Sequence, residues 1–505
     1  MIRANRNSMV KGGASGVGVL CLAGALLSCG GCGSSSSGNQ GAAGSGGRAG
    51  SGGAAGAGGT AGVIGGAGAA GSSIGDGAAG VDGAAGGGVT ADGAAGSDAA
   101  ASSDAAGGSD AAAGSDGAVA DGAAGAMIFG AGLAVVDGDY TSTSISIVGA
   151  TGTLVKDDCI NSGTQAAGKL SLTLSGDVVL PSQPQRGGDL WLVDRANAAL
   201  TIVTPPTCAV SGQISVGTGF KSDPHDVAVV SDTKIYVTRY NTNVAPPDAN
   251  STGDDVLILD RATGAITGRI ALTTYAAPVA TFVIEAQPDR MVIAGGKVYV
   301  TLGSQDAKFM AAGEGRVVVI DPTTDTVTGT IALTGLKGCS AIQYVPTLSS
   351  LFVSCGGSFS DADQSAASGI AQVDLSTVMP TVRVTKASVV GGQPVNFFWI
   401  GVLSGTQGFA GTLGSFATAT TAATKDAVYL FNPTAGTATP LSLTAGAYDL
   451  GGAVVGPALL FVPDATMSKP LIHVFDVPAI GPPSERTPFS PDPSKGLPPR
   501  QIAWF

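Results

Sequence analysis

The stretch VLILDRATGAITGRIALT at residues 256–273 returns without a gap as VVVIDPTTDTVTGTIALT at residues 317–334. Half of the aligned positions are identical, and the two copies lie 61 residues apart. Each copy follows a second shared element, KIYVT at residues 234–238 and KVYVT at residues 297–301. Self-similarity at a period of this length is the signature of a repeat architecture. The repeat is therefore stronger evidence for the fold than any local pattern.

Each copy is predicted to form a β-hairpin. The apolar run VLIL has strand length and ends at Asp260, whose carboxylate can accept hydrogen bonds from backbone N–H groups of the following turn. Ile266 and Ile270 then belong to a second strand that is rich in β-branched residues and shows no helical period. Because one hairpin cannot bury both faces, several such units must pack together or close on themselves.

The acid or amide that ends the first strand of the hairpin recurs along the chain at spacings of 44 to 66 residues. A spacing of this size holds about four short strands, which is the size of a β-propeller blade. The recurring residues are Asp194, Asp260, Asp321, Asp374, Asn432 and Asp476.

The segments YVTRYN at residues 236–241 and YVT at residues 299–301, each followed by such a hairpin, resemble the YVTN-repeat (surface-layer and YncE-like) β-propeller family. In other blades LFVS at residues 351–354 and LLFV at residues 459–462 stand in for the motif. The resemblance implies a β-propeller fold. It leaves the function open, because propellers with this repeat include surface-layer, binding and enzyme-associated proteins.

The globular part, residues 127–505, is predicted to be an all-β, seven-bladed β-propeller, with eight blades as the alternative count. LAVV at residues 133–136 and ISIV at residues 145–148 look like outer strands without an inner one, whereas RQIAWF at residues 500–505 is a strand without a blade. Pairing of these N- and C-terminal strands would complete blade one and remove exposed sheet edges. Blades two to seven are expected at residues 169–220, 224–275, 288–336, 338–390, 395–446 and 448–489.

Residues 1–28 are predicted to be the signal peptide of a bacterial lipoprotein. A positively charged start precedes an apolar segment at residues 17–27 that is too short to span a bilayer comfortably. The following LLSC resembles the lipobox, which implies that Cys29 becomes the lipidated first residue of the mature chain. Gly30 after it favours anchoring in the outer membrane, on its periplasmic or surface side. The alternative is an ordinary secretory signal cleaved near Gly33.

Residues 29–126 are predicted to be a disordered tether between the lipid anchor and the propeller. From residue 33 the segment is almost wholly Gly, Ala, Ser and Asp, so no apolar burial offsets the entropic cost of ordering. Aspartates spaced six apart could suggest a calcium-binding β-roll, but such repeats need large apolar residues where this run has alanine. A solvated, self-repelling coil is the better explanation.

Four of the seven cysteines lie in the globular part, an even number suited to disulfides in an oxidising compartment. In blade five a register with Ile342 opposite Phe352 would set Cys339 opposite Cys355, which predicts a bridge between these two cysteines. By elimination the second bridge joins blade one to blade two, through Cys159 and Cys208. Zinc binding is the alternative, but the chain has no CxxC pair and only two histidines.

The starts of the innermost strands would ring one mouth of the central channel, where propellers commonly bind ligands. His225, in the segment SDPHD at residues 222–226, lies at such a start. The alternative is that the side chains at this mouth pair with one another and cap strand ends. The predicted ligand-binding residues are His225, Asp226, Arg290, Asn396, Asp449 and Arg500, and Asp289, Ser340 and Gln501 occupy matching positions.

No catalytic residue and no resident cofactor are assigned from the sequence. His473 lies mid-strand and is expected to be a packed or edge residue. Calcium could be held by Asp361 with Asp363, or by Asp254 with Asp255, although solvated loop acids are the simpler explanation.

The function predicted from these patterns is a monomeric, lipid-anchored envelope module that binds a protein, peptide or glycan and has no catalytic activity. The net charge of −12 argues against nucleic acid as a partner, because phosphate binding needs clustered cations. The competing hypothesis is a propeller enzyme, namely a lyase, hydrolase or dehydrogenase subunit, with its site around His225. Lyases that resemble this repeat family use a histidine with nearby acids and a metal ion. A spacer or coat protein without a specific ligand is the third hypothesis.

Overall fold

The computed structural model describes residues 129–505 except residues 360, 362, 390–394 and 418–421. The predicted signal peptide, Cys29 and the predicted tether lie outside the described residues. Within the described part, no helix reaches the length and apolar character of a membrane-spanning segment.

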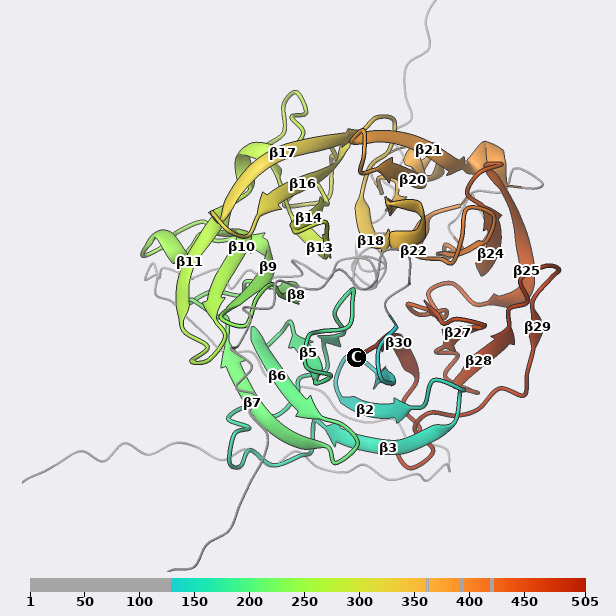
Figure 1. The fold of residues 1–505 in the computed structure, drawn as a ribbon, viewed down its shortest axis with the longest axis horizontal. Coiled ribbons are helices and arrows are strands. Elements are labelled where there is room, and N and C mark those ends of the chain that lie inside the picture. The colour runs from blue at the N-terminus through green and yellow to red at the C-terminus, as the bar shows by residue number, and fades with distance from the viewer. Residues whose placement is uncertain (1–128, 360, 362, 390–394, 418–421) are drawn as a thin grey trace, which may run out of the picture. The chain divides into compact units, whose positions relative to one another are not determined.

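Seven antiparallel sheets of four strands each follow one another around a ring (Figure 1). Blade one holds β1 (Leu133–Gly138), β2 (Thr143–Val148), β3 (Leu154–Asn161) and β30 (Pro499–Trp504). Blade two holds β4 (Val178–Val179), β5 (Leu190–Asp194), β6 (Ala199–Thr204) and β7 (Ala209–Ser215). Blade three holds β8 (Pro224–Val229), β9 (Lys234–Thr242), β10 (Gly253–Asp260) and β11 (Ile266–Ala271). Blade four holds β13 (Pro288–Ala294), β14 (Lys297–Leu302), β16 (Gly315–Asp321) and β17 (Thr326–Leu333).

Blade five holds β18 (Cys339–Val345), β19 (Ser350–Gly356), β20 (Ser368–Asp374) and β21 (Met379–Thr385). Blade six holds β22 (Phe397–Val402), β23 (Gly408–Thr412), β24 (Asp426–Asn432) and β25 (Thr437–Ala445). Blade seven holds β26 (Val454–Val455), β27 (Leu459–Asp464), β28 (Leu471–Asp476) and β29 (Ser484–Glu485). A separate two-stranded sheet pairs β12 (Ile284–Glu285) with β15 (Gln305–Asp306). The short 3₁₀ helices are η1 (Ala249–Ser251), η2 (Thr273–Tyr275), η3 (Pro346–Leu348), η4 (Gln364–Ala367) and η5 (Lys386–Ser388). The predicted seven-bladed, all-β propeller is thus confirmed.

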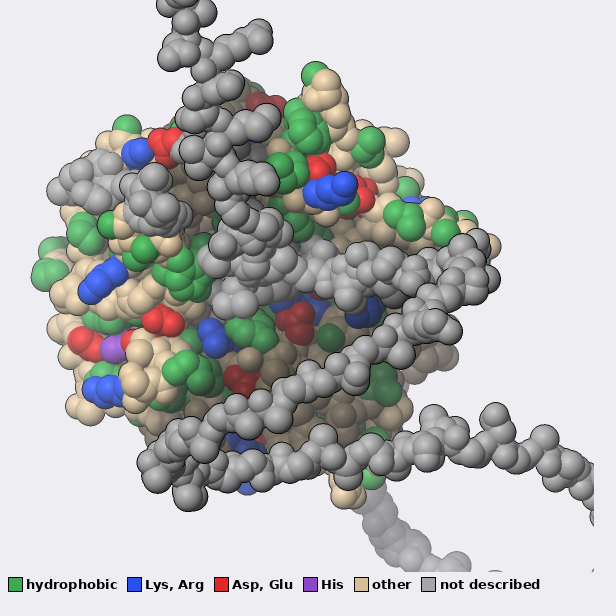
Figure 2. Space-filling view, turned by 180° about the vertical axis from the view of Figure 1, so that it is seen from behind, with side chains coloured by type: hydrophobic (Ala, Val, Ile, Leu, Met, Phe, Trp, Pro, Cys, Tyr) green, Lys and Arg blue, Asp and Glu red, His purple; other side chains and the backbone are tan. Residues whose placement is uncertain are grey.

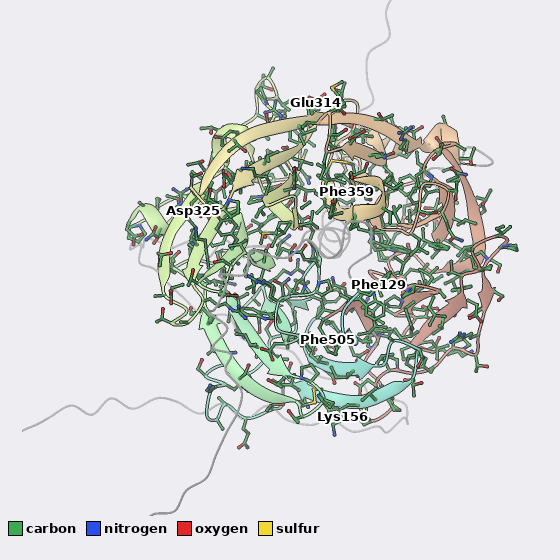
Figure 3. The ribbon with its side chains drawn as sticks, viewed as in Figure 1. Phe129, Lys156, Glu314, Asp325, Phe359 and Phe505 are labelled. Carbon is green, nitrogen blue, oxygen red and sulfur yellow. A yellow bond between two sulfur atoms is a disulfide. The ribbon has the colours of Figure 1, made fainter. Side chains whose placement is uncertain are left out.

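The closure of the ring is also confirmed. β30 pairs antiparallel with β1, with Leu133 opposite Trp504 and Val135 opposite Ile502. The backbone N–H of Phe505 continues the ladder by donating to the carbonyl of Gly132 at 3.0 Å. Phe129 packs on Trp504 on one side of this junction, and Phe505 packs into the cluster between blades one and two on the other (Figure 3). The first and last described strands therefore complete one blade, which leaves no gap in the ring.

The position of a strand within its blade explains its sequence pattern. β10, the third strand of blade three, is buried over most of its length and contains the apolar run Val256–Leu259. The outermost strand β17, with the sequence TVTGTIAL, instead alternates exposed and covered residues. A strand covered on both faces is expected to be continuously apolar, and one covered on a single face is expected to alternate.

Apolar clusters fill the spaces between neighbouring blades in the described chain. Between blades three and four, for example, Tyr236 and Val256 pack against Met291, Val300 and Val318. Equivalent clusters lie at the other six junctions, including the one between blade seven and the closing strand. The core is therefore divided into seven parts, and each blade depends on both neighbours.

Both predicted disulfides are present, between Cys339 and Cys355 and between Cys159 and Cys208. The register predicted around the first of them is wrong by one residue. Cys339 does face Cys355, but a β-bulge between Cys339 and Ala341 shifts the following pairs, so Ile342 faces Val353 instead of Phe352.

Replacing both Cys159 and Cys208 by serine is expected to lower the free energy of unfolding by about 2–4 kcal/mol, because the bridge restricts the unfolded chain. The two cysteines are 49 residues apart and link the outer strand of blade one to the β6–β7 turn. Urea unfolding under oxidising conditions measures the change. An unchanged midpoint in the double variant would contradict this expectation.

Candidate functional site

A cavity of about 280 Å3 lies among the innermost strands. Every innermost strand, β4, β8, β13, β18, β22, β26 and β30, contributes residues to its wall, so it occupies the central channel. Acidic and basic side chains are interspersed over the face of the molecule seen in Figure 2. The structure brings three of the predicted site residues to this cavity, namely His225, Arg290 and Arg500.

His225, the second residue of β8, is held on three sides. Its Nδ1 lies 2.8 Å from Oδ1 of Asp289, and its Nε2 lies 3.3 Å from Oδ2 of Asp223. The imidazole also stacks on the ring of Tyr240, with 4.3 Å between the ring centroids. Only 2% of His225 is exposed to solvent. The side chain therefore links the inner strands of blades three and four.

His225 belongs to a row of side chains in which acidic and basic groups alternate. Arg195 forms an ion pair with Asp177 and lies 3.9 Å from Oδ1 of Asp223. At the other end, Nε of Arg290 lies 3.6 Å from Oδ1 of Asp289. The row is electrically neutral when the imidazole carries a proton. Its order along blades two to four is Asp177, Arg195, Asp223, His225, Asp289 and Arg290.

The electrostatic surroundings of His225 favour its protonated form. Burial by itself lowers the pKa of the imidazole, but the carboxylates of Asp223 and Asp289 outweigh it and raise the pKa above the ordinary value. Protonation of His225 therefore stabilises the fold.

Replacing His225 by glutamine is expected to flatten the dependence of the melting temperature on pH. In the wild type the contribution of the protonated imidazole is fully present below the unfolded-state pKa of about 6.5, and it is lost as pH rises through the higher folded-state pKa. Thermal unfolding of both proteins between about pH 6 and pH 9 measures the difference. His473 is common to both proteins and cancels in the comparison. Parallel curves would contradict the assignment.

Arg290 and Arg500 extend the polar part of the wall. Nη1 of Arg290 donates to the carbonyl of Leu180 at 2.7 Å, and Nε of Arg500 donates to the carbonyl of Gly138 at 2.9 Å. The guanidinium of Arg500 also lies over the ring of Tyr140, 4.7 Å from its centroid. Both cations are thus fixed by backbone carbonyls at the starts of their strands.

The other three predicted site residues do not line the cavity. Asp226 is fully buried and accepts hydrogen bonds from the backbone N–H groups of Ser182 and Met291, which joins blade three to its two neighbours. Asn396 precedes β22 and directs its amide nitrogen to the carbonyl of Leu413. The carboxylate of Asp449 is turned towards Gly446 in its own loop. The role of all three residues in ligand binding stays a prediction.

Sequence reasoning missed the residues that hold the inner wall together. Asp223 lies in the quoted SDPHD segment, but its pairing with His225 depends on a left-handed backbone conformation that the sequence did not reveal. Three glutamine side chains accept a hydrogen bond from a backbone N–H group on the unpaired edge of an innermost strand. The donors are Ile293 to Gln183, Val229 to Gln185 and Val402 to Gln343. Their signal is weak, because a single glutamine in a loop, or in a strand as for Gln343, has no distinctive pattern.

The acids considered for calcium are engaged with protein groups. Asp255 pairs with Arg239 and Arg269, and Asp254 accepts backbone N–H groups of Ala286 and Gln287. Likewise, the other two acids each pair with a lysine, as Asp361 with Lys337 and Asp363 with Lys386. Among the described residues, no group of three or more histidine, cysteine or acidic side chains has the geometry of a metal site. Calcium binding stays a prediction.

His473 lies in β28, with its Nδ1 2.6 Å from Oε1 of Glu485 in β29 and its Nε2 3.3 Å from Oδ2 of Asp464 in β27. The imidazole therefore crosslinks three strands of blade seven, in agreement with the expected packed or edge position.

No family model matches this chain, and no curated protein matches it. The following solved structures resemble it at low sequence identity. The hydrazine synthase of Kuenenia stuttgartiensis is 15% identical over 59% of this chain and 77% of that chain, with a TM-score of 0.40. BamB from Moraxella catarrhalis is 14% identical over 70% of this chain and 87% of that chain, with a TM-score of 0.35. A functionally unknown protein from Desulfotomaculum acetoxidans is 13% identical over 59% of this chain and 78% of that chain, with a TM-score of 0.36. The fold assignment accordingly rests on the sheet topology of the chain itself.

Proposed function

We propose that this protein is a non-catalytic binding module of the bacterial cell envelope, anchored by a lipid on Cys29, whose channel mouth contacts a protein, peptide or glycan. The closed ring supplies a stiff scaffold, because each blade packs on both neighbours. Two disulfides suit an oxidising, extracytoplasmic compartment.

The observation that carries this proposal is the environment of His225. A general acid or base must reach its substrate within hydrogen-bond distance. Both ring nitrogens of His225 instead face carboxylates, and the ring is covered by Tyr240. Such an arrangement supports a role in holding blades three and four together rather than in proton transfer.

Capture from an envelope extract tests the binding function. The full chain is expected to retain a component that the double variant Arg290→Gln, Arg500→Gln loses. Lys156→Gln is the matched control, because it removes an exposed cation on the outer strand β3, at the rim of the ring (Figure 3). Equal retention by the three proteins, or no retention by any, would contradict the proposal. A turnover that His225→Gln abolishes while the fold stays intact would favour the enzyme instead.

The anchor is tested separately by Cys29→Ala. The wild type is expected in the membrane fraction with a covalently bound acyl chain, and the variant is expected without one. An acylated Cys29→Ala protein, or a wild type free of lipid, would rule out the lipobox assignment.

A further inference from the structure

The channel cavity changes from charged to apolar along its length. In β13 Arg290 precedes Ile293, and in β30 Arg500 precedes Trp504, all of them lining the cavity. Neighbouring innermost strands run in the same direction, as the parallel bridge between Gly452 and Gln501 illustrates at the closing junction. The charged side chains of the wall therefore lie towards the strand starts, whereas the later residues of β13, β26 and β30 that line the cavity are mainly apolar.

The charged end of the wall offers hydrogen-bond donors that protein acceptors leave unused. Within the described part of the chain, the terminal nitrogens of Arg500 and Nη2 of Arg290 have no hydrogen-bond partner. The hydroxyl of Ser340, which also lines the cavity, is buried and likewise has no partner among the described residues. Guanidinium groups with free N–H pairs match the geometry of carboxylate and phosphate oxygens.

The acidic groups in the same wall are already neutralised. Asp177 pairs with Arg195, and Asp289 contacts both His225 and Arg290. Arg500 has no described carboxylate within ion-pair distance, although its charge acts on the carboxyl of Asp449, where it partly offsets the rise in pKa caused by burial. The wall therefore presents positive charge to the cavity, although the protein as a whole carries a net charge of −12.

Apolar side chains surround the other end of the cavity. Ile400 of β22, Ile293 of β13 and Val454 of β26 all line it and are only half-buried, so part of each faces the open space. Contact with an apolar group would remove this surface from water, which is favourable. The two ends together suit a molecule with a charged head and an apolar body.

We infer that the cavity binds a small organic anion, with a carboxylate or phosphate head at Arg290 and Arg500 and an aliphatic or aromatic body directed towards Ile293, Ile400 and Val454. This inference rests on the proposed binding function and adds the class of ligand to it. The volume of about 280 Å3 lies near the lower end of the range for ligand pockets, which limits the ligand to a small molecule.

Straight-chain probes test the inference on the full chain. Octanoate and octyl phosphate share an apolar body with octan-1-ol and octylammonium but differ from them in charge. Because Trp399 and Trp504 line the cavity, binding is expected to change the tryptophan fluorescence, with calorimetry as the second measurement. At least one anion is expected to bind about tenfold or more tightly than the alcohol and the ammonium. Equal binding of octan-1-ol, or no binding of either anion at about 1 mM, would overturn the inference.

Variants of the cations provide the second part of the test. Arg500→Gln and Arg290→Gln are each expected to weaken anion binding by about tenfold or more, whereas Arg500→Lys retains more of it. Arg486→Gln is the matched control, because Arg486 pairs with Asp476 on β28, outside the cavity wall. Melting temperatures identify any variant that fails to fold, in which case the other arginine carries the test. Unchanged affinity in a folded variant of either arginine would overturn the inference.

The two proposals fail in distinguishable ways. If the wild type retains an envelope component through Arg290 and Arg500 but binds neither anion, the ligand class is wrong and the binding function stands. If an anion binds but no envelope component is retained, the envelope partner is wrong and the anion site stands.

Discussion

Replacing Trp504 by alanine is expected to lower the free energy of unfolding by about 3–5 kcal/mol, the range for removing a large buried aromatic side chain. Trp504 is 7% exposed and packs in the cluster between blade seven and the closing strand. Its Nε1 donates to the carbonyl of Val455 at 2.8 Å, and its ring meets Phe129 edge to face. The variant therefore loses apolar burial and also leaves the Val455 carbonyl without this donor.

Urea unfolding followed by circular dichroism measures this change without depending on tryptophan fluorescence. Val155→Ala is the control, because Val155 lies on the outer strand β3 and is 53% exposed. Surface substitutions of this kind usually change stability by less than about 0.5 kcal/mol. If the two variants unfold at the same urea concentration, the closing strand does not stabilise the ring as argued.

The importance of Trp504 follows from the way the ring is closed. In the other blades the innermost strand leads directly into the rest of its sheet, whereas β30 reaches blade one from the opposite end of the chain. The pairing of β1 with β30 therefore brings together residues more than 350 positions apart, from Leu133 to Trp504. Contacts so distant in sequence carry a large entropic cost before they form, and the buried aromatic side chains offset part of it.

The fold could be predicted because each blade is encoded by a similar short stretch of sequence. One hairpin with a shared pattern of β-branched residues indicates one blade, and counting its copies gives the ring. The strand at residues 500–505 belongs to no complete blade of its own, so it was predicted to pair with the strand β1. The observed pairing confirms this prediction. The disulfides followed from the same blade assignment, which set Cys339 opposite Cys355 even though the register predicted for the rest of that hairpin was wrong by one residue.

The site could be predicted only in part because its chemistry depends on backbone irregularities. Because the innermost strands of different blades start at equivalent positions, His225, Arg290 and Arg500 were predicted to lie at one mouth of the channel. All three line the cavity. The same equivalence cannot show that Asp449 turns towards its own loop, nor that a bulge follows Cys339. A shift of one residue moves a side chain to the other face of a strand, so such irregularities decide which residues reach the channel.

The charged row in blades two to four clarifies the choice between the two interpretations given to the channel mouth. Pairing and strand capping account for Asp223, His225, Asp226 and Asp289, whose polar atoms contact protein groups. They account less fully for Arg500, whose Nε donates to the carbonyl of Gly138 while its terminal nitrogens have no hydrogen-bond partner among the described residues. The structural role thus belongs to these four residues, whereas the proposed binding role falls to Arg500.

Replacing Arg239 by methionine is expected to lower the free energy of unfolding by about 3 kcal/mol, near the lower end for breaking a buried ion pair, because Asp255 keeps its contact with Arg269. Arg239 and Asp255 are opposite one another in β9 and β10, and neither side chain is exposed. Nε and Nη2 of Arg239 donate to the two carboxylate oxygens at 2.8 and 2.7 Å, while Nη1 and Nη2 also reach Thr218 and Asn250. Methionine fills similar volume but satisfies none of these acceptors.

The matched control is Arg486→Met, because Arg486 also makes a two-pronged contact with an aspartate, Asp476, but on an exposed part of blade seven. Solvent compensates for the loss of such a pair, so its unfolding midpoint is expected to stay close to that of the wild type. The double variant Arg239→Met, Asp255→Leu removes both buried charges and is expected to recover part of the loss, although Arg269 then loses its own partner. Equal midpoints for Arg239→Met and Arg486→Met would show that burial of the pair does not set its contribution.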